Sequence, residues 1–259
     1  MSLQKIVNEE YKQVSPTETG TIIAPKNARI KSLVRSFENY LTTIEKIDSL
    51  FLVQSAYSNA WLELRKYPLH QTYTPEDIFN FSILISEYES HSQFDILGFF
   101  LSAMINVHAE KQQSKPTYQI STKQYSKKIA GIGCQNEGVR IKVLGSVGGC
   151  AGMQMKKGIL IITDDAENYL GLHMQGGKII AKKAGDYVGK NMTYGTIELE
   201  SCGNFLGTES KNGIIRIKNS FESIGKYNEY WETAEINPYA TVSAKIYCKR
   251  KRVDVKKYT

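Results

Sequence analysis

The chain has 259 residues, of which 41% are hydrophobic and 23% charged, so it has the composition of a globular protein with room for one large or two small domains. No apolar run is long enough to span a bilayer, and the amino terminus lacks the apolar core of a signal peptide, so we expect a cytoplasmic protein. The net charge of +7 is unevenly shared: residues 1–112 hold 10 Lys and Arg against 13 Asp and Glu, whereas residues 113–259 hold 23 against 13. This asymmetry indicates an anionic partner for the second part.

Residues 1–27 have no clear apolar period and contain proline, serine, threonine and glycine, so we expect a loosely ordered arm. From residue 28 to residue 112, apolar positions recur at steps of three and four, which is the period of amphipathic helices. A Thr-Pro-Glu-Asp run beginning at Thr74 predicts one helix start, because Thr caps a helix, Pro fits its first turn and acids favour its positive end. We expect a helical domain here, with its last helix capped by Ser92.

A polar stretch before Pro116 is the predicted linker, and residues 118–121 predict the first strand of a second domain over 117–259. Glycines recur in this domain: the leading glycines are separated by 19, 18 and 18 residues, and a second glycine follows each of them. A fixed period of about twenty residues with one short strand per unit is typical of a stacked solenoid. The glycines assigned to the repeat are Gly152, Gly158, Gly171, Gly177, Gly185, Gly189, Gly195, Gly203, Gly207 and Gly213.

Apolar residues follow the same register, since Leu160, Ile179, Ile197 and Ile215 each stand two residues after a second glycine. Such columns predict coils that place like side chains above one another. The predicted fold class is therefore α+β: a helical N-terminal bundle followed by a right-handed, single-stranded parallel β-helix with coils of about 18 residues. Its strands are expected near 158–163, 177–182, 195–200 and 213–218, with a weaker coil before them and a closing strand within 237–248.

The run from Gly185 to Ile197 resembles the GXGXG repeat, and the run over 171–180 is similar to it. That repeat forms the C-terminal β-helix of the large glutamate synthase subunit and the C subunit of formylmethanofuran dehydrogenase, and stand-alone archaeal proteins carry it too. The resemblance covers roughly residues 130–220. It implies a scaffold that packs against catalytic parts, and it transfers no catalytic residue to this chain.

The chain offers few candidates for chemistry. Ser146 lacks the first glycine of a nucleophile elbow, and the glycine-rich runs at 145–149 and 185–190 lack the helix or the Ser/Thr ligand that phosphate-binding loops require. His173 stands in register with Gln154, Asn191 and Glu209, which indicates a solvent-facing polar ladder rather than a metal ligand. We therefore predict no catalytic residue and no cofactor.

The cysteines contain no Cys-x-x-Cys pair, and we expect them to be small core or turn residues rather than ligands of a metal. They are Cys134, Cys150, Cys202 and Cys248. No metal site is predicted.

The last fifteen residues carry seven cations against one acid. Candidate contacts for an anionic partner are Lys249, Arg250, Lys251 and Arg252, which could touch nucleic acid or an acidic protein, or direct nuclear targeting. The alternative is a solvated tail or strand edge in which like charges discourage pairing.

The leading hypothesis is a non-catalytic scaffold or assembly module for protein–protein interaction. A second hypothesis is a nucleic-acid-binding protein that uses the basic C-terminal part. A third, which follows from the resemblance, is a structural subunit of a glutamate-synthase-like or formylmethanofuran-dehydrogenase-like redox enzyme. None of the three involves a membrane, and the sequence leaves the oligomeric state open.

Overall fold

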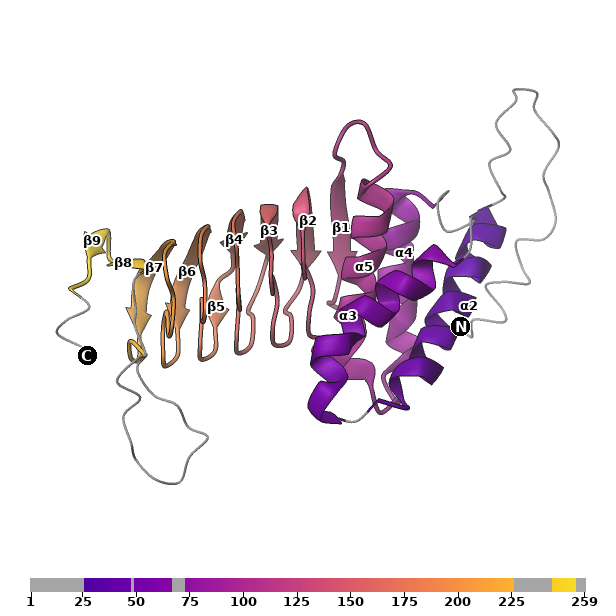
Figure 1. Cartoon of the computed structure of the whole chain (residues 1–259), viewed down its shortest axis with the longest axis horizontal. Helices are drawn as coiled ribbons and strands as arrows, with labels where there is room; N and C mark the ends of the chain where they lie inside the picture. Colours follow the sequence, from indigo (N-terminus) through magenta and orange to yellow (C-terminus); the bar gives the residue numbers. More distant parts are fainter. Residues whose placement is uncertain (1–25, 48, 67–72, 226–243, 255–259) are drawn as a thin grey trace.

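The computed structural model describes residues 26–47, 49–66, 73–225 and 244–254. Apart from its last two residues, the predicted arm over 1–27 lies outside these ranges. In the described part, four helices stand at one end of an elongated solenoid whose strands follow one another along its axis (Figure 1). The solenoid has about six turns of roughly 19 residues, and the α+β prediction is confirmed.

Four α-helices and two short 3₁₀ helices form the N-terminal part of the described chain. Thr74 caps one of them as predicted: its hydroxyl accepts the Asp77 N–H at 3.2 Å, while the Asp77 carboxylate accepts the Thr74 N–H at 2.8 Å. The α-helices are α2 (Lys26–Ile44), α3 (Ser49–Arg65), α4 (Pro75–Leu84) and α5 (Leu97–Ala109), and the 3₁₀ helices are η2 (Ile85–Tyr88) and η3 (Phe94–Ile96).

The predicted start of the last helix at Ser92 is wrong. Helix α5 begins at Leu97, its N-cap Ile96 makes no side-chain cap, and η3 precedes it. The reason is tertiary, because the Asp95 carbonyl accepts the Ala130 N–H from the first coil of the solenoid. A regular helix starting at Ser92 would use that carbonyl for its own ladder.

The strands form one sheet in the order β1-β2-β3-β4-β6-β7-β8-β9, with β5 paired to β6. Every pair is parallel except the last, in which β9 turns back antiparallel on β8. The strands are β1 (Thr117–Ser121), β2 (Glu137–Leu144), β3 (Lys157–Ile162), β4 (Lys178–Ile180), β5 (Lys183–Ala184), β6 (Thr196–Cys202), β7 (Ile214–Phe221), β8 (Lys245–Cys248) and β9 (Lys251–Arg252).

The predicted apolar column is confirmed by the strand register, which pairs Leu160 with Ile179, Ile179 with Ile197, and Ile197 with Ile215. All four side chains are fully buried. The leading glycines repeat one backbone hydrogen bond, since each donates its N–H at 2.8 Å to a carbonyl of the preceding coil. These bonds join Gly152 to Ile132, Gly171 to Ala151, Gly189 to Leu170, and Gly207 to Val188.

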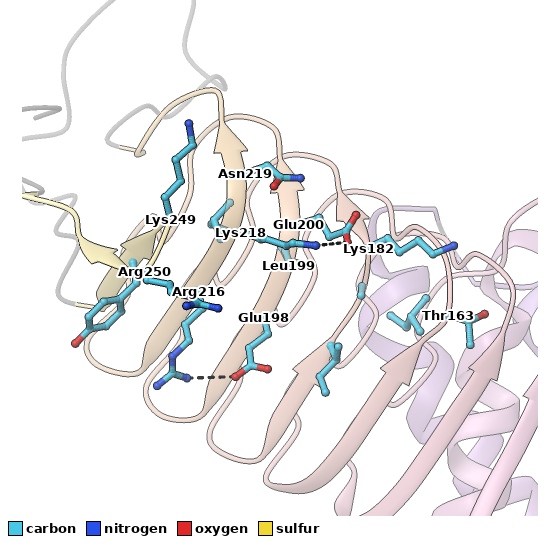
Figure 2. Close-up of a pocket in the computed structure, with 15 residues that line it drawn as sticks. Thr163, Lys182, Glu198, Leu199, Glu200, Arg216, Lys218, Asn219, Lys249 and Arg250 are labelled. Atoms are coloured by element: carbon cyan, nitrogen blue, oxygen red, sulfur yellow. Dashed lines mark hydrogen bonds and ion pairs between the residues drawn. The ribbon is translucent and has the colours of Figure 1, made fainter.

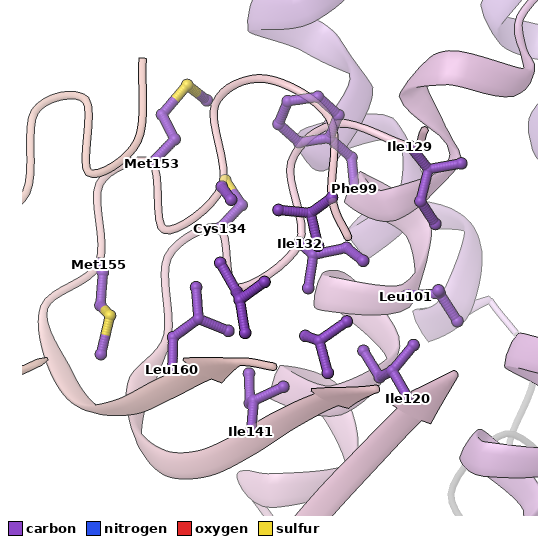
Figure 3. Close-up of a cluster of buried hydrophobic side chains, with 14 of the residues drawn as sticks. Phe99, Leu101, Ile120, Ile129, Ile132, Cys134, Ile141, Met153, Met155 and Leu160 are labelled. Carbon is purple, nitrogen blue, oxygen red and sulfur yellow. The ribbon is translucent and has the colours of Figure 1, made fainter. Parts of the chain in front are cut away.

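Helix α5 closes the first end of the solenoid and shares its hydrophobic core. Phe99 and Leu101 of α5 meet Ile120 of β1 and Ile132 of the first coil in one buried cluster (Figure 3). The hydroxyl of Ser102 lies 2.8 Å from the Gly131 carbonyl and accepts the Gly133 N–H at 2.8 Å. The helices thus cover strand and core that an open first coil would expose.

Candidate functional site: a basic groove on the sheet face

Charged side chains of neighbouring coils lie side by side on the outward face of the sheet. Successive residues of a strand point to opposite faces, so the parallel register places outward residues of neighbouring coils side by side. Glu198 of β6 pairs in register with Arg216 of β7, which pairs with Tyr247 of β8. Lys218 continues the same face, and its Nζ lies 3.3 Å from the Glu200 carboxylate one coil earlier.

These side chains line a groove of about 1160 Å³, which we call the basic groove (Figure 2). The described residues that line it include five cations and two carboxylates, an excess of three positive charges. The charged lining residues are Lys182, Arg216, Lys218, Lys249 and Arg250 with Glu198 and Glu200, and Ile180 and Tyr247 contribute apolar surface.

Ion pairs hold three of these cations in place. Arg216 Nη1 lies 3.4 Å from Glu198 and Lys182 Nζ lies 2.6 Å from Asp164. The hydrogen bond and charge of Asp164 raise the pKa of Lys182, and those of Lys182 lower the pKa of Asp164. Such pairs are solvent-exposed, with Lys218 72% accessible, so they add little to the stability of the fold. These pairs orient the cations but leave them able to bind an anionic ligand.

The structure divides the predicted basic cluster into two parts. Lys249 and Arg250 form the two-residue loop between β8 and β9 and line the basic groove. Lys251 and Arg252 form β9 itself, the last strand of the described sheet. β9 is an edge strand of the described sheet, and an edge strand can pair with a strand of another chain. The exposed like charges of β9 discourage such pairing.

Sequence reasoning missed the cations that precede the cluster. Lys182, Glu200 and Lys218 are spaced by 18 residues, as are Glu198 and Arg216. The same step that organises the glycines would have placed these charges on one face. The charges at this step were the signal that was available.

The ten repeat glycines lie at turns of the coils and at the starts of strands. Eight of them have positive φ, whereas Gly185 and Gly203 do not. At Gly203, a Cβ would come within 2.1 Å of the Asp186 carboxylate, which accepts the Asn204 N–H at 2.6 Å. The missing side chain therefore allows an acidic residue of one coil to bond the backbone of the next.

His173 lies on a second surface, a ledge of polar turns. It shares positive φ with Gln154, Asn191 and Glu209, and a hollow of about 510 Å³ lies beside it, lined also by Tyr194. Partial desolvation and the nearby Lys190 lower the pKa of His173. The hollow itself is lined by amides, hydroxyls and the His173 imidazole, while the charged Lys190 and Glu209 lie near the ring.

Three of the four cysteines have a pKa that is raised by burial. Burial raises the pKa of Cys134 and Cys150, and raises that of Cys202 to about 12, so these thiols stay protonated at neutral pH. Among the described residues, no group of three His, Cys, Asp or Glu side chains is arranged to hold a metal ion. Across the same ranges, no helix combines the length and apolar character that a membrane span requires.

Comparison with known proteins found no protein-family model, no curated protein and no solved structure that matches this chain significantly. The basic groove is therefore interpreted from its own residues.

Proposed function

We propose that this protein is a non-catalytic scaffold or assembly module that docks a partner protein on the basic groove. The observation that carries the proposal is the display of cations from successive coils on one regular sheet face that ends at the Lys249–Arg250 loop. A stacked sheet holds its outward side chains at fixed spacing, so a docked segment meets a preorganised surface.

The resemblance to the GXGXG repeat supports the same reading. In the two enzymes that contain it, the β-helix packs against catalytic parts. The corresponding alternative for this chain is a structural subunit of a glutamate-synthase-like or formylmethanofuran-dehydrogenase-like enzyme. Co-purification of such catalytic subunits with the full chain would distinguish this alternative from an independent assembly module.

Nucleic acid is the second candidate partner, and the positive excess of the groove favours it. Neutralised phosphates release counterions, so the logarithm of the affinity would fall linearly with the logarithm of salt, with a slope of about −0.9 per duplex phosphate contact. Four contacts would give a slope of roughly −3.6. A protein partner would instead survive nuclease treatment.

The experiment places a photo-crosslinking amino acid at Asn219, which lines the groove, and in a control at the exposed Lys211. Extract of the source cells is treated with or without nuclease before crosslinking and affinity capture. We expect a nuclease-resistant protein adduct from position 219 that is absent from position 211. Adducts that vanish with nuclease would contradict the proposal and favour nucleic acid.

A charge-matched pair of variants completes the test. Changing Lys249, Arg250, Lys251 and Arg252 to Gln removes the cluster, whereas changing four exposed cations elsewhere removes the same net charge. We expect the first variant to lose the position-219 adduct and the second to keep it. The control positions are Arg35, Lys46, Lys111 and Lys211.

A further inference from the structure

The loop between β8 and β9 is built from residues that its backbone disfavours. Cys248 and Lys251 pair directly across the hairpin, which leaves Lys249 and Arg250 as a two-residue loop. Their φ angles are 48° and 65°, the positive pair that a type I′ turn requires. Asn-Gly is the preferred sequence for such turns, and left-handed backbone strains long side chains.

Unlike the other cations of the groove, Lys249 and Arg250 form no ion pair with a described residue. Within the described residues, the ion pairs of the groove involve Lys182, Arg216 and Lys218, and none involves Lys249 or Arg250. Both side chains line the groove at the end of the sheet face (Figure 2). The loop therefore presents two cations that no described carboxylate of this chain neutralises.

The rest of the lining selects among anionic ligands. Glu198 and Glu200 lie among the cations, where they would repel a continuous row of phosphates. Among the described residues of the lining, Tyr247 is the only aromatic one, and the Arg216 guanidinium lies 5.9 Å from its ring centroid, over a face that a base would need for stacking. Ile180 adds an apolar element. A chain with acids, apolar side chains and some cations fits this lining better than a polyphosphate.

We propose that the basic groove binds an extended acidic segment of a partner protein, with Lys249 and Arg250 as the cations that fix its end. This rests on the proposed scaffold function and names the chemistry of the partner. The turn accepts strained residues because they carry the charges that contact the segment. Replacing them with the preferred turn residues should therefore improve the fold and weaken binding together.

The test uses the full chain and a fluorescein-labelled acidic peptide, in which glutamate is in excess over interspersed leucine and lysine, in anisotropy titrations, with oligothymidylate as the competing probe. In the Lys249→Asn, Arg250→Gly variant we expect the melting temperature to rise by about 2–4 °C, the shift of roughly 1 kcal/mol in a domain of this size. We expect peptide affinity to fall about tenfold, the loss that 1.4 kcal/mol represents. Binding of the wild-type chain should disappear near 1 M salt, where the Debye length is about 3 Å.

Two further variants separate charge from backbone conformation. Lys249→Gln with Arg250→Gln should lose the same affinity without the rise in melting temperature. Lys111→Gln with Lys211→Gln, which removes two exposed cations elsewhere, should bind the peptide as the wild type does. Unchanged peptide affinity in both loop variants would overturn the inference.

Tighter binding of oligothymidylate than of the acidic peptide, lost in the same loop variants, would also overturn it and would count against the scaffold function. A nuclease-resistant protein adduct at position 219, together with no binding of the acidic peptide, would overturn the inference alone and leave a scaffold whose groove docks a partner of other chemistry.

Discussion

Gly195 tests the stacking of the coils most directly. Its φ is +105°, and an added Cβ would lie 3.0 Å from both the Gly176 carbonyl carbon and the Gly177 carbonyl oxygen of the preceding coil. It would also lie 2.7 Å from the Met174 methyl, but a flexible side-chain end can move. The backbone of the preceding coil would have to shift by a few tenths of an ångström, which disturbs the strand spacing of about 4.8 Å that the hydrogen bonds set. The added methyl group of Gly195→Ala can therefore be accommodated only if the backbone of the sheet shifts.

The expected loss follows from two contributions. Disfavoured φ costs about 1–3 kcal/mol and overpacking about 1–3 kcal/mol more, which gives about 4 kcal/mol at the centre of the range. Total stability is about 5–15 kcal/mol, so the variant loses a large part of it, and its melting temperature should fall by about 8–16 °C. Urea titration of the full chain, followed by far-UV circular dichroism, measures the change in the free energy of unfolding.

Gly149→Ala is the matched control. Gly149 lies outside positive φ, and its added Cβ would meet only the Asn168 carbonyl oxygen, at 3.3 Å. Since Ala restricts the unfolded chain, we expect a change within about 1 kcal/mol of the wild type. If the two variants unfold at the same urea concentration, the coils can separate locally and the reasoning from fixed stacking is refuted.

Two further predictions concern the helical end. Asp77→Ala removes both the capping box and the carboxylate that lies 2.9 Å from Arg29 Nε, and the side chains of Asp77 and Arg29 are 1% and 10% exposed. We therefore expect the free energy of unfolding, measured by urea titration, to fall by about 3 kcal/mol. A loss smaller than that of an alanine substitution at an exposed residue would contradict the buried pair. Burial lowers the pKa of His108 below its usual 6.5, so the folded state disfavours the protonated ring. The contribution of His108 to the stability of the fold is therefore complete above about pH 6.5 and is lost as the pH falls through its lowered pKa. The melting temperature should therefore drop between neutral pH and pH 5, more steeply than in His108→Gln; parallel profiles would exclude His108 as the cause.

The repeat was predictable because its signal is additive over coils. The step of 18 residues fixed both the glycine turns and the buried column through Ile179, Ile197 and Ile215, and the structure confirms that column. The Thr74 cap was predictable because all its partners lie within one turn of the helix. The start of α5 was not, because it depends on a contact between Asp95 and Ala130 that local sequence does not contain.

The basic groove was predictable only in part. Lys249 and Arg250 drew attention as a charge run, but their separation from Lys251 and Arg252 depends on the hairpin that puts one pair in a loop and the other in a strand. The groove also forms only because each coil brings the chain back to the same face of the sheet. Residues as far apart in sequence as Lys182 and Arg250 then line one groove. Segments far apart in sequence become neighbours through the fold alone.

The hydrogen bonds of the leading glycines give the molecule a property that a globular core lacks. Each coil donates to the one before it and accepts from the one after it at equivalent atoms, and helices close one end while a hairpin closes the other. A whole coil could therefore be duplicated or deleted between these ends without leaving a backbone donor unpaired. Length would change in units of about 4.8 Å. Natural variants of this protein should differ by complete coils, and the number of coils would set how long a partner segment the face can receive.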